Sequence, residues 1–417
     1  MQMIGLVDGN NFFVSCERIF APGLEGRPVA VLSNNDGCCV SRSNEFKALG
    51  IPMGTPYFQV KPLMERHGIV LCSSNYGLYG DISRRVIAVL EEFAPKVEQY
   101  SIDEAFIHPG LPAGGDYYSY GVRLRRCVLQ WVGIPCGVGF APTRTLAKLA
   151  NHIGKKLPSG VFVMPEDCRE ILENTPVSEI WGVGRALAPK LMTAGIRTAR
   201  QLAEQDPAAI RRRYSVVLAK TVMELRGVSC IEEEAPDDGS KSISCSRSFG
   251  YPVESLTELE ESVAAYASRA AEKLRREGKL ISGANVYLQP HRPTDGFFQF
   301  APAVSATVIF DPPTDDTGCI VSALRPKVKG IFTPGCRYRK SGVIFFGLEK
   351  AEGRQGTLFG GNAVKSELFR AADKLNAKFG RGTLFLLGEG IEKPWQMKRD
   401  MLSPAYTTDW NDIPVVK

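Results

Sequence analysis

Short runs of apolar residues alternate along the chain with segments in which apolar residues recur every three or four positions. Apolar runs bounded by polar turn residues predict buried strands, whereas the wider spacing predicts helices with one buried face. The strand-like runs are residues 3–7, 29–32, 136–141, 283–288, 297–300, 306–310 and 342–346. Helical periodicity covers residues 10–20, 81–94, 120–131, 144–151 and 256–274.

This mixture of strands, helices and antiparallel hairpins predicts an α+β fold, and 417 residues are enough for two to four domains. Residues 171–230 are helical in pattern. The segment Ile231–Lys241 combines acids with Pro and Gly, which makes it the best candidate for a linker between domains.

Two neighbouring carboxylates, Asp103 and Glu104, interrupt the apolar pattern of the segment Tyr100–Phe106. Neighbouring side chains of a regular strand point to opposite faces, so two acids that act together must stand at a turn or a strand end. An exposed turn with two solvated acids is the alternative. Asp8 ends the first apolar run and supplies a third carboxylate. Together the three acids could hold two Mg²⁺ ions, the arrangement used for in-line phosphoryl displacement.

Several other polar positions suit a bound triphosphate. Ser41, Asn44 and Lys47 are spaced three apart, which would place them on one face of a helix that Gly50 ends. A hydroxyl, an amide and an ammonium group on one face would suit phosphate oxygens. An ordinary solvated helix face is the alternative.

Two further features are compatible with phosphate contacts. Gly137 and Gly139 lie at the end of a predicted strand, which is a weak phosphate signal by itself. Lys155 and Lys156 follow the helix predicted at 144–151 and offer ammonium groups. A solvated lysine pair is the alternative.

The segment Ile180–Gly184, followed by a helix predicted at residues 185–193, is typical of a helix-hairpin-helix. Gly182 and Gly184 allow a sharp turn, and the N-terminus of the next helix offers backbone N–H groups to a DNA phosphate. A purely structural helical hairpin is the alternative.

Charge is distributed unevenly. Residues 1–240 carry 26 Lys+Arg and 26 Asp+Glu, residues 241–350 carry 15 and 11, and residues 351–417 carry 10 and 8. A neutral first half with a basic second half favours an enzyme that holds a polyanion on an accessory domain. A randomly uneven surface would give the same totals.

Cysteine and histidine usage argues against a zinc site or a disulfide framework. The 11 cysteines include no Cys-x-x-Cys pair, and the 4 histidines share no metal-ligand spacing. An apolar run of membrane-spanning length and a secretory signal are both missing, so we expect a cytoplasmic protein that does not cross a membrane.

At its acidic motifs the chain resembles the Y-family, or translesion, DNA polymerases, and within them the UmuC group, the catalytic subunits of bacterial DNA polymerase V. The resemblance covers nearly the whole chain. Its marks are Asp8 with the aromatic pair Phe12–Phe13, and the segments Ser101–Glu104, Leu32–Cys38, Ser73–Tyr76, Cys245–Gly250 and Trp395–Arg399.

The resemblance implies a palm, small fingers, a helical thumb, an α/β little finger and a C-terminal tail that binds the clamp or other partners. The corresponding residues are 1–32 and 81–170 for the palm, 33–80 for the fingers, 171–230 for the thumb, 231–241 for a linker, 242–350 for the little finger and 351–417 for the tail.

The resemblance also implies roles for single residues. The catalytic metal ligands are Asp8, Asp103, Glu104 and the backbone of Gly9. Phe13 is the steric gate that rejects ribonucleotides, although the family often has Tyr there. The other nucleotide contacts are Phe12, whose side chain we expect in the core, with Ser41, Asn44, Lys47 and Lys155, or Lys156 as the alternative to Lys155. The family often has Tyr and Arg where Asn44 and Lys47 stand. DNA contacts are Gly182, Gly184 and Arg247, and the clamp-binding peptide is Gln355, Leu358 and Phe359.

The implied activity is error-prone DNA synthesis past damage in the SOS response, with two Mg²⁺ ions and without proofreading. The implied substrates are primer-template DNA and a deoxynucleoside triphosphate. The implied partners are a UmuD′-like accessory dimer, a RecA-type recombinase filament and the sliding clamp, at the nucleoid. A DNA-binding module with an inactive palm and a palm-type nucleotidyl cyclase are the alternative functions.

Overall fold

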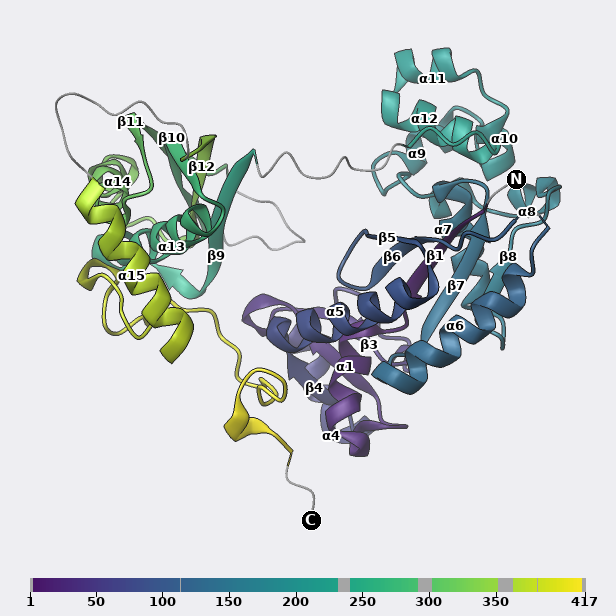
Figure 1. Ribbon diagram of the computed structural model, residues 1–417, viewed down its shortest axis with the longest axis horizontal. Coiled ribbons are helices and arrows are strands. Elements are labelled where there is room, and N and C mark those ends of the chain that lie inside the picture. The colour runs from purple at the N-terminus through teal and green to yellow at the C-terminus, as the bar shows by residue number, and fades with distance from the viewer. Residues whose placement is uncertain are drawn as a thin grey trace. The chain divides into compact units, whose positions relative to one another are not determined.

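The computed structural model describes residues 3–112, 114–231, 241–291, 302–351, 363–380 and 382–414. The chain forms two compact units, residues 1–234 with 401–417, and residues 235–400 (Figure 1). Three sequence predictions lie outside the described residues: most of the linker, the strand at residues 297–300, and the clamp-binding Gln355, Leu358 and Phe359.

Within the described residues, five strands form the central sheet of the first unit, in the order β5-β6-β1-β7-β8. Strand β1 lies in the middle and is antiparallel to both of its neighbours. The strand bounds are β1 Ile4–Gly9, β5 Lys96–Gln99, β6 Glu104–His108, β7 Cys136–Ala141 and β8 Val161–Val163. The strands predicted at residues 3–7 and 136–141 are confirmed.

Both faces of this sheet are buried. Val7 and Ala105 pack on one face against α1 Phe12–Phe20, α5 Tyr76–Phe93 and α6 Tyr117–Val132. Leu6 and Phe106 pack on the other face against α7 Arg144–Gly154 and the helices that follow it. Burial on both faces explains why β1 and β7 consist of nearly continuous apolar residues. The four predicted helices are confirmed, with ends that differ by a few residues.

A smaller sheet, β3-β2-β4, lies between α1 and α5 in the sequence. Strand β2 pairs antiparallel with β3 and parallel with β4. The strand bounds are β2 Val29–Leu32, β3 Cys39–Arg42 and β4 Val70–Ser73. The short helices of this region are α2 Asn44–Ala48, α3 Tyr57–Val60 and α4 Met64–His67.

Residues 169–225 are helical, as predicted. The helices are α8 Arg169–Glu173, α9 Ala188–Thr193, α10 Ala199–Ala203, α11 Pro207–Arg213 and α12 Val216–Leu225. The helix predicted at 185–193 begins only at Ala188, because Pro189 is favoured in the first turn of a helix and residues 185–187 continue the preceding turn.

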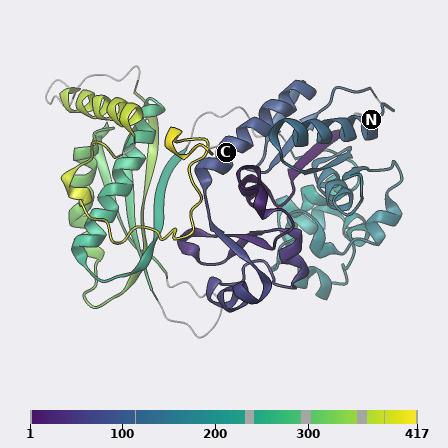
Figure 2. The same cartoon turned by 90° about the horizontal axis from the view of Figure 1, so that it is seen from below.

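In the described part of the second unit, four strands form an antiparallel sheet in the order β11-β10-β12-β9. Their bounds are β9 Ser242–Val253, β10 Lys279–Pro290, β11 Val304–Thr314 and β12 Tyr338–Lys350. Helices α13 Leu256–Arg276 and α14 Thr317–Ile331 cover the same side of the sheet (Figure 2), and α15 Ala363–Phe379 follows.

Strands β10, β11 and β12 and helix α13 correspond to elements predicted from the sequence, whereas β9, α14 and α15 have no predicted counterpart. In β9 the buried side chains Ile243, Cys245 and Phe249 alternate mainly with serines, so the strand lacks a continuous apolar run. Helix α14 contains Pro326, a residue that usually interrupts a helix.

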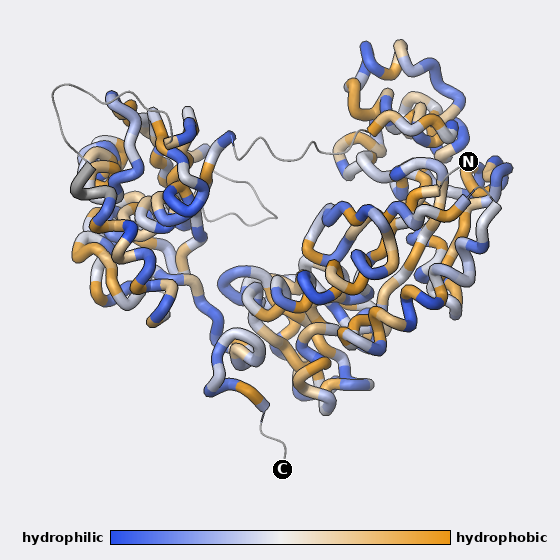
Figure 3. The backbone as a smooth tube through the Cα atoms, viewed as in Figure 1, coloured by the Kyte–Doolittle hydropathy of each residue, from blue (hydrophilic) through white to orange (hydrophobic). Residues whose placement is uncertain are grey.

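The tube in Figure 3 alternates between hydrophobic and hydrophilic residues along the helices of each unit, as expected for helices with one buried face. None of the helices in the described ranges combines the length and the apolar character that a membrane crossing requires.

Helix α7 packs unusually close to the central sheet. A Cβ atom added at Gly139 of β7 would overlap the backbone of Asn151, so only glycine fits at this position. The buried Asn151 amide donates hydrogen bonds to the carbonyl oxygens of Leu6 (3.3 Å) and Gly137 (2.8 Å). The two glycines predicted as a weak phosphate signal therefore have a packing role, because they let α7 lie directly on β1 and β7.

We expect Gly139→Ala to lower the free energy of unfolding by about 1–3 kcal/mol, because the added methyl group would push α7 away from β7. Urea unfolding followed by circular dichroism measures the change. Gly80→Ala is the matched control, since a Cβ at Gly80 in α5 meets no atom within 4 Å. Equal stability of both variants would contradict the packing role.

Candidate active site

Asp8 and Glu104 face each other across the pairing of β1 with β6. The register places Asp8 opposite Glu104 and Leu6 opposite Phe106. Leu6 and Phe106 lie in the core beneath α7, and residues two apart in a strand share a face. Both carboxylates therefore project on the α7 side of the sheet. The Cβ atoms of directly opposed residues in an antiparallel pair lie about 4.5–5.5 Å apart.

Asp103 lies just outside the strand, in the bend that precedes β6. The Ser101 hydroxyl accepts the backbone N–H groups of Asp103 (3.3 Å) and Glu104 (3.0 Å) and donates to Asp103 Oδ1 (2.6 Å). The Gly9 N–H donates to the Asp103 carbonyl at 2.9 Å, which fastens the bend to the end of β1. The expectation that two acids acting together stand at a turn or a strand end is confirmed, because Asp103 lies in the bend and Glu104 is the first residue of β6.

Two lysines of the α7 segment pair with these carboxylates. Lys155 Nζ lies 2.7 Å from Asp8 Oδ2. Lys148 Nζ lies 2.9 Å and 3.2 Å from the two carboxylate oxygens of Glu104. Lys155 was predicted to contact phosphate, whereas no role was predicted for Lys148. Their spacing of seven residues, two helical turns, was the signal that both would lie on the same face of α7.

Burial is the main cause that raises the pKa of Asp8 to about 6. Lys155 opposes this shift, and the negative charges of Glu104 and Asp103 add to it. A carboxylate raises the pKa of a neighbouring carboxyl only when the two are close. The shift is therefore a second sign, besides the strand register, that the three acids form one site with an excess of negative charge.

The described residues contain no group of three or more His, Cys, Asp or Glu side chains placed to hold a metal ion. Two of the three acids are paired with lysines. The acids nevertheless suit hard divalent cations in number and donor type, because carboxylate oxygens are the ligands that Mg²⁺ prefers. Asp8, Asp103 and Glu104 are the residues that could hold such ions.

A second group of polar residues lies on α1 and α2. Lys47 Nζ donates to Asn11 Oδ1 (2.6 Å), and the Asn11 amide donates to Asn44 Oδ1 (3.1 Å). Burial and the positive charges of Arg42 and Lys155 lower the pKa of Lys47. Arg42 and Lys155 are therefore close enough to Lys47 to act on its charge.

The predicted helix face of Ser41, Asn44 and Lys47 is only partly correct. Asn44 and Lys47 are both exposed on α2, but Ser41 belongs to strand β3 and is buried. The helix starts later than predicted because Ser43 is its N-cap and accepts the N–H of Phe46.

The two aromatic residues after Asp8 differ in their surroundings. Phe12 is buried in the core, as its interpretation as a core residue predicted, so its side chain is not available as a nucleotide contact. Phe13 is partly buried and stacks on Tyr79, with ring centroids 4.5 Å apart and an interplanar angle of 11°.

The predicted helix-hairpin-helix turn lies near Glu104. Gly182 has φ +87°, a conformation that favours glycine, and Gly184 has open space around its Cα. Trp181 contacts Tyr100 edge to face at 5.7 Å, and Lys148 Nζ lies 5.0 Å from the Trp181 ring. Trp181 and Tyr100 thus help to position a lysine that pairs with Glu104, a role that the sequence did not indicate.

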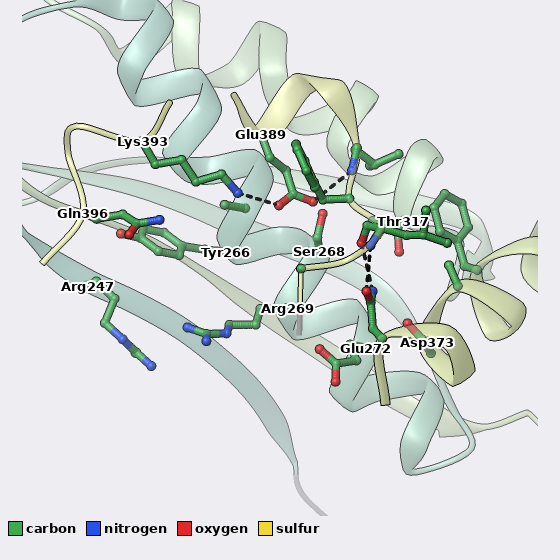
Figure 4. A pocket seen from close by; sticks show the side chains of 18 of the residues that line it. Arg247, Tyr266, Ser268, Arg269, Glu272, Thr317, Asp373, Glu389, Lys393 and Gln396 are labelled. Carbon is green, nitrogen blue, oxygen red and sulfur yellow. Dashed lines mark hydrogen bonds and ion pairs between the residues drawn. The ribbon is translucent and has the colours of Figure 1, made fainter. Parts of the chain in front are cut away.

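Arg247 lies on β9 in the second unit and lines a cavity of about 550 Å³ (Figure 4). Arg247 is two residues from each of the buried Cys245 and Phe249, so it shares their face of the strand, the side that α13 covers. Arg269 also lines the cavity. None of the three acids contributes to this cavity.

The cavity lies between α13 and the C-terminal residues of the same unit. Its charged residues include two ion pairs, Arg275 with Asp373 (2.6 Å) and Lys393 with Glu389 (3.3 Å). Beside it, the Gly250 N–H donates to the carbonyl of Trp395 (3.3 Å). The segments Cys245–Gly250 and Trp395–Arg399 therefore pack together.

Four family models match successive parts of the chain. The impB/mucB/samB family matches residues 7–152, its helix-hairpin-helix motif residues 165–196 and its C-terminal domain residues 240–358. A domain of unknown function, DUF4113, matches residues 366–416.

Curated relatives match over the full length. The chain is 43% identical to protein UmuC of Salmonella typhimurium over 100% of both chains. It is 40% identical to protein MucB of Escherichia coli over 99% of both chains. It is also 29% identical to DNA polymerase IV of Desulfatibacillum aliphaticivorans over 91% of this chain and 94% of the relative.

Solved structures with the same fold include a Y-family DNA polymerase chimera of Dbh and Dpo4, with a TM-score of 0.66 and 20% identity over 84% of this chain and 99% of the chimera. A ternary complex of Dbh DNA polymerase has a TM-score of 0.55 at 19% identity, with 84% of this chain and 99% of the other chain covered. The fold is therefore that of the Y-family DNA polymerase structures, and the 43% identity to UmuC over the full length of both chains shows that the chain belongs to the impB/mucB/samB family, in its UmuC group.

Proposed function

We propose that this chain extends a DNA primer opposite damaged template in the SOS response, using deoxynucleoside triphosphates and two Mg²⁺ ions. The observation that carries the proposal is the meeting of Asp8 and Glu104 across β1 and β6, with Asp103 fastened beside them. Three carboxylates at one point are the donors that two-metal phosphoryl transfer needs.

In this proposal Asp8 and Asp103, with the Gly9 backbone, hold both ions, and Glu104 completes the site beside the primer 3′-hydroxyl. Bound there, the ions would lower the pKa of the attacking hydroxyl and neutralise the leaving phosphate. The lysines that pair with Asp8 and Glu104 would balance the negative charge of the site before substrate arrives.

The triphosphate is assigned to Lys47, Lys155 and Asn44. The electrostatic effect of Arg42 and Lys155 on Lys47 supports this assignment, because cations that repel one another create the positive potential that a polyphosphate neutralises. Ser41 is left out because it is buried in β3.

We assign Gly182, Gly184 and Arg247 to DNA backbone contacts, because an enzyme that tolerates lesions gains nothing from reading bases. The polymerase would act at the nucleoid with a UmuD′-like dimer, a RecA-type filament and the sliding clamp.

We expect Asp103→Asn and Glu104→Gln each to lower primer extension by at least about 100-fold, because each removes charge that stabilises the transition state. Extension of a labelled primer on a template with Mg²⁺ measures the loss. Glu91→Gln, which changes an exposed acid of α5, is the control and should retain activity. Substantial extension by either site variant would refute the assignment.

We expect Phe13→Ala to reduce discrimination against ribonucleotides by about 100-fold, because it removes the wall that the 2′-hydroxyl would strike. The readout is the ratio of kcat/KM for the deoxynucleotide and the matching ribonucleotide. Phe58→Ala changes an exposed phenylalanine of α3 and should leave the ratio as it is. An unchanged ratio in Phe13→Ala would show that another residue is the gate.

The raised pKa of Asp8 predicts a pH-dependent affinity for Mg²⁺. A carboxyl with a folded-state pKa of about 6, above its ordinary 3.8, is protonated in the metal-free protein at pH 5, so binding must displace a proton. Affinity should therefore fall by about tenfold for each pH unit below about 6.

The shift in Tm that Mg²⁺ causes, measured at pH 7.5 and pH 5, tests this expectation without an activity assay. The shift should be smaller at pH 5 in the native chain, and small at both values in Asp8→Asn. A shift of the same size at both pH values in the native chain would contradict it.

A further inference from the structure

The chain returns to the first unit in its last residues. We name Met401–Tyr406 the clasp. Ser73, at the end of β4, and Met401 exchange two hydrogen bonds: the Ser73 N–H donates to the Met401 carbonyl (2.9 Å), and the Met401 N–H donates to the Ser73 hydroxyl (3.0 Å). Tyr406 stacks on Phe20 of α1, with ring centroids 4.8 Å apart and an interplanar angle of 9°.

Asn75 holds the clasp and the start of α5 at the same time. Its amide nitrogen lies 3.0 Å from the Ser403 hydroxyl, 3.3 Å from the Ser403 carbonyl and 3.2 Å from the Pro404 carbonyl. Its carbonyl oxygen accepts the N–H of Leu78 as the N-cap of α5. The side chain that starts this helix is therefore fixed by the C-terminal residues.

The clasp also donates a hydrogen bond to a buried acid, Glu17. Glu17 of α1 is only 2% exposed, and Glu17 Oε1 accepts hydrogen bonds from the Tyr79 hydroxyl (2.6 Å) and the Ser403 hydroxyl (3.1 Å). Burial raises the pKa of Glu17, and both hydrogen bonds oppose that effect. A buried carboxylate that lost one of its donors would be left partly unsatisfied, so Ser403 and Tyr79 are energetically linked through it.

Tyr79, which Glu17 holds by a hydrogen bond, in turn stacks on Phe13. The Tyr79 side chain is fully buried, and its ring lies parallel to the Phe13 ring. Tyr76 contacts Phe13 edge to face at 5.9 Å, so two aromatic rings of α5 define the orientation of the Phe13 ring. Aromatic pairs of this kind are attractive beyond the area that they bury, so they bias the position of a partly buried ring.

We propose that the clasp is a positioning element for Phe13: Ser403 fixes Glu17, Glu17 fixes Tyr79, and Tyr79 fixes the ring that discriminates between deoxyribose and ribose. The C-terminal residues thereby contribute to sugar selectivity without touching the nucleotide. This inference rests on the proposed role of Phe13 as the steric gate.

The test measures the ratio of kcat/KM for a deoxynucleotide and its ribonucleotide in the full-length chain. Tyr79→Leu, which removes the stacked ring, should lower the ratio by about tenfold or more. Ser403→Ala, which removes one donor to Glu17, should lower it about threefold, and Ser403→Thr, which keeps the hydroxyl, should restore it. A general loss of folded protein lowers both rates and leaves their ratio unchanged.

Ser178→Ala, an exposed serine of the first unit outside the clasp, is the matched control and should keep the native ratio. Should Phe13→Ala relax selectivity while Tyr79→Leu and Ser403→Ala keep the native ratio, the clasp would have no positioning role although the gate assignment stands. A native chain that extends no primer would instead refute the proposed function.

A readout that needs no activity completes the test. 4-Fluorophenylalanine in place of Phe13 gives a fluorine resonance that reports the surroundings of the ring. We expect Ser403→Ala to shift or broaden this resonance and Ser178→Ala to leave it unchanged. A resonance that Ser403→Ala leaves unchanged would overturn the inference whatever the chain catalyses.

Discussion

The antiparallel pairing of β1 with β6 decides where the acids of this protein point. Side chains alternate along a strand, so a slip of one residue would turn Asp8 away from Glu104 and towards the opposite core. The register is held because Leu6 and Val7 are buried on opposite faces, in different cores. The packing that fixes the register of the sheet therefore also brings the acids of the site together.

Helix α7 adds the positive charge that this pairing requires. Three carboxylates held together would repel one another, and the raised pKa of Asp8 reflects burial first and that repulsion in addition. Lys148 and Lys155 oppose it from one face of the helix, which can approach the sheet only because Gly139 has no side chain. A packing feature of β7 thus determines the electrostatics at the end of β1.

The C-terminal residues belong to both units of the chain. Residues around Trp395 pack on β9 in the second unit, whereas the clasp packs on β4 and α1 in the first. Each contact involves a segment that the sequence marks as typical of the UmuC group, Cys245–Gly250 in one case and Ser73–Tyr76 in the other.

The sequence by itself determined that a buried strand ends in Asp8, that Asp103 and Glu104 stand at a strand end, and that the second unit combines a sheet with an amphipathic helix. These features depend on the local alternation of apolar and polar residues and on turn residues, both of which can be recognised within a short segment of sequence. It also indicated the family, because the acidic motifs and the group-specific segments are contiguous in the chain.

Only the tertiary structure decided which residues meet. The register that opposes Asp8 to Glu104, the pairing of Lys148 with Glu104, the burial of Ser41 in β3 and the contact of Ser403 with Glu17 join positions that are far apart in sequence. Such contacts depend on how whole elements pack, and no local periodicity encodes that packing. The sequence therefore specified the chemical groups of the site, and the packing of β1, β6, α7 and the clasp specified their partners.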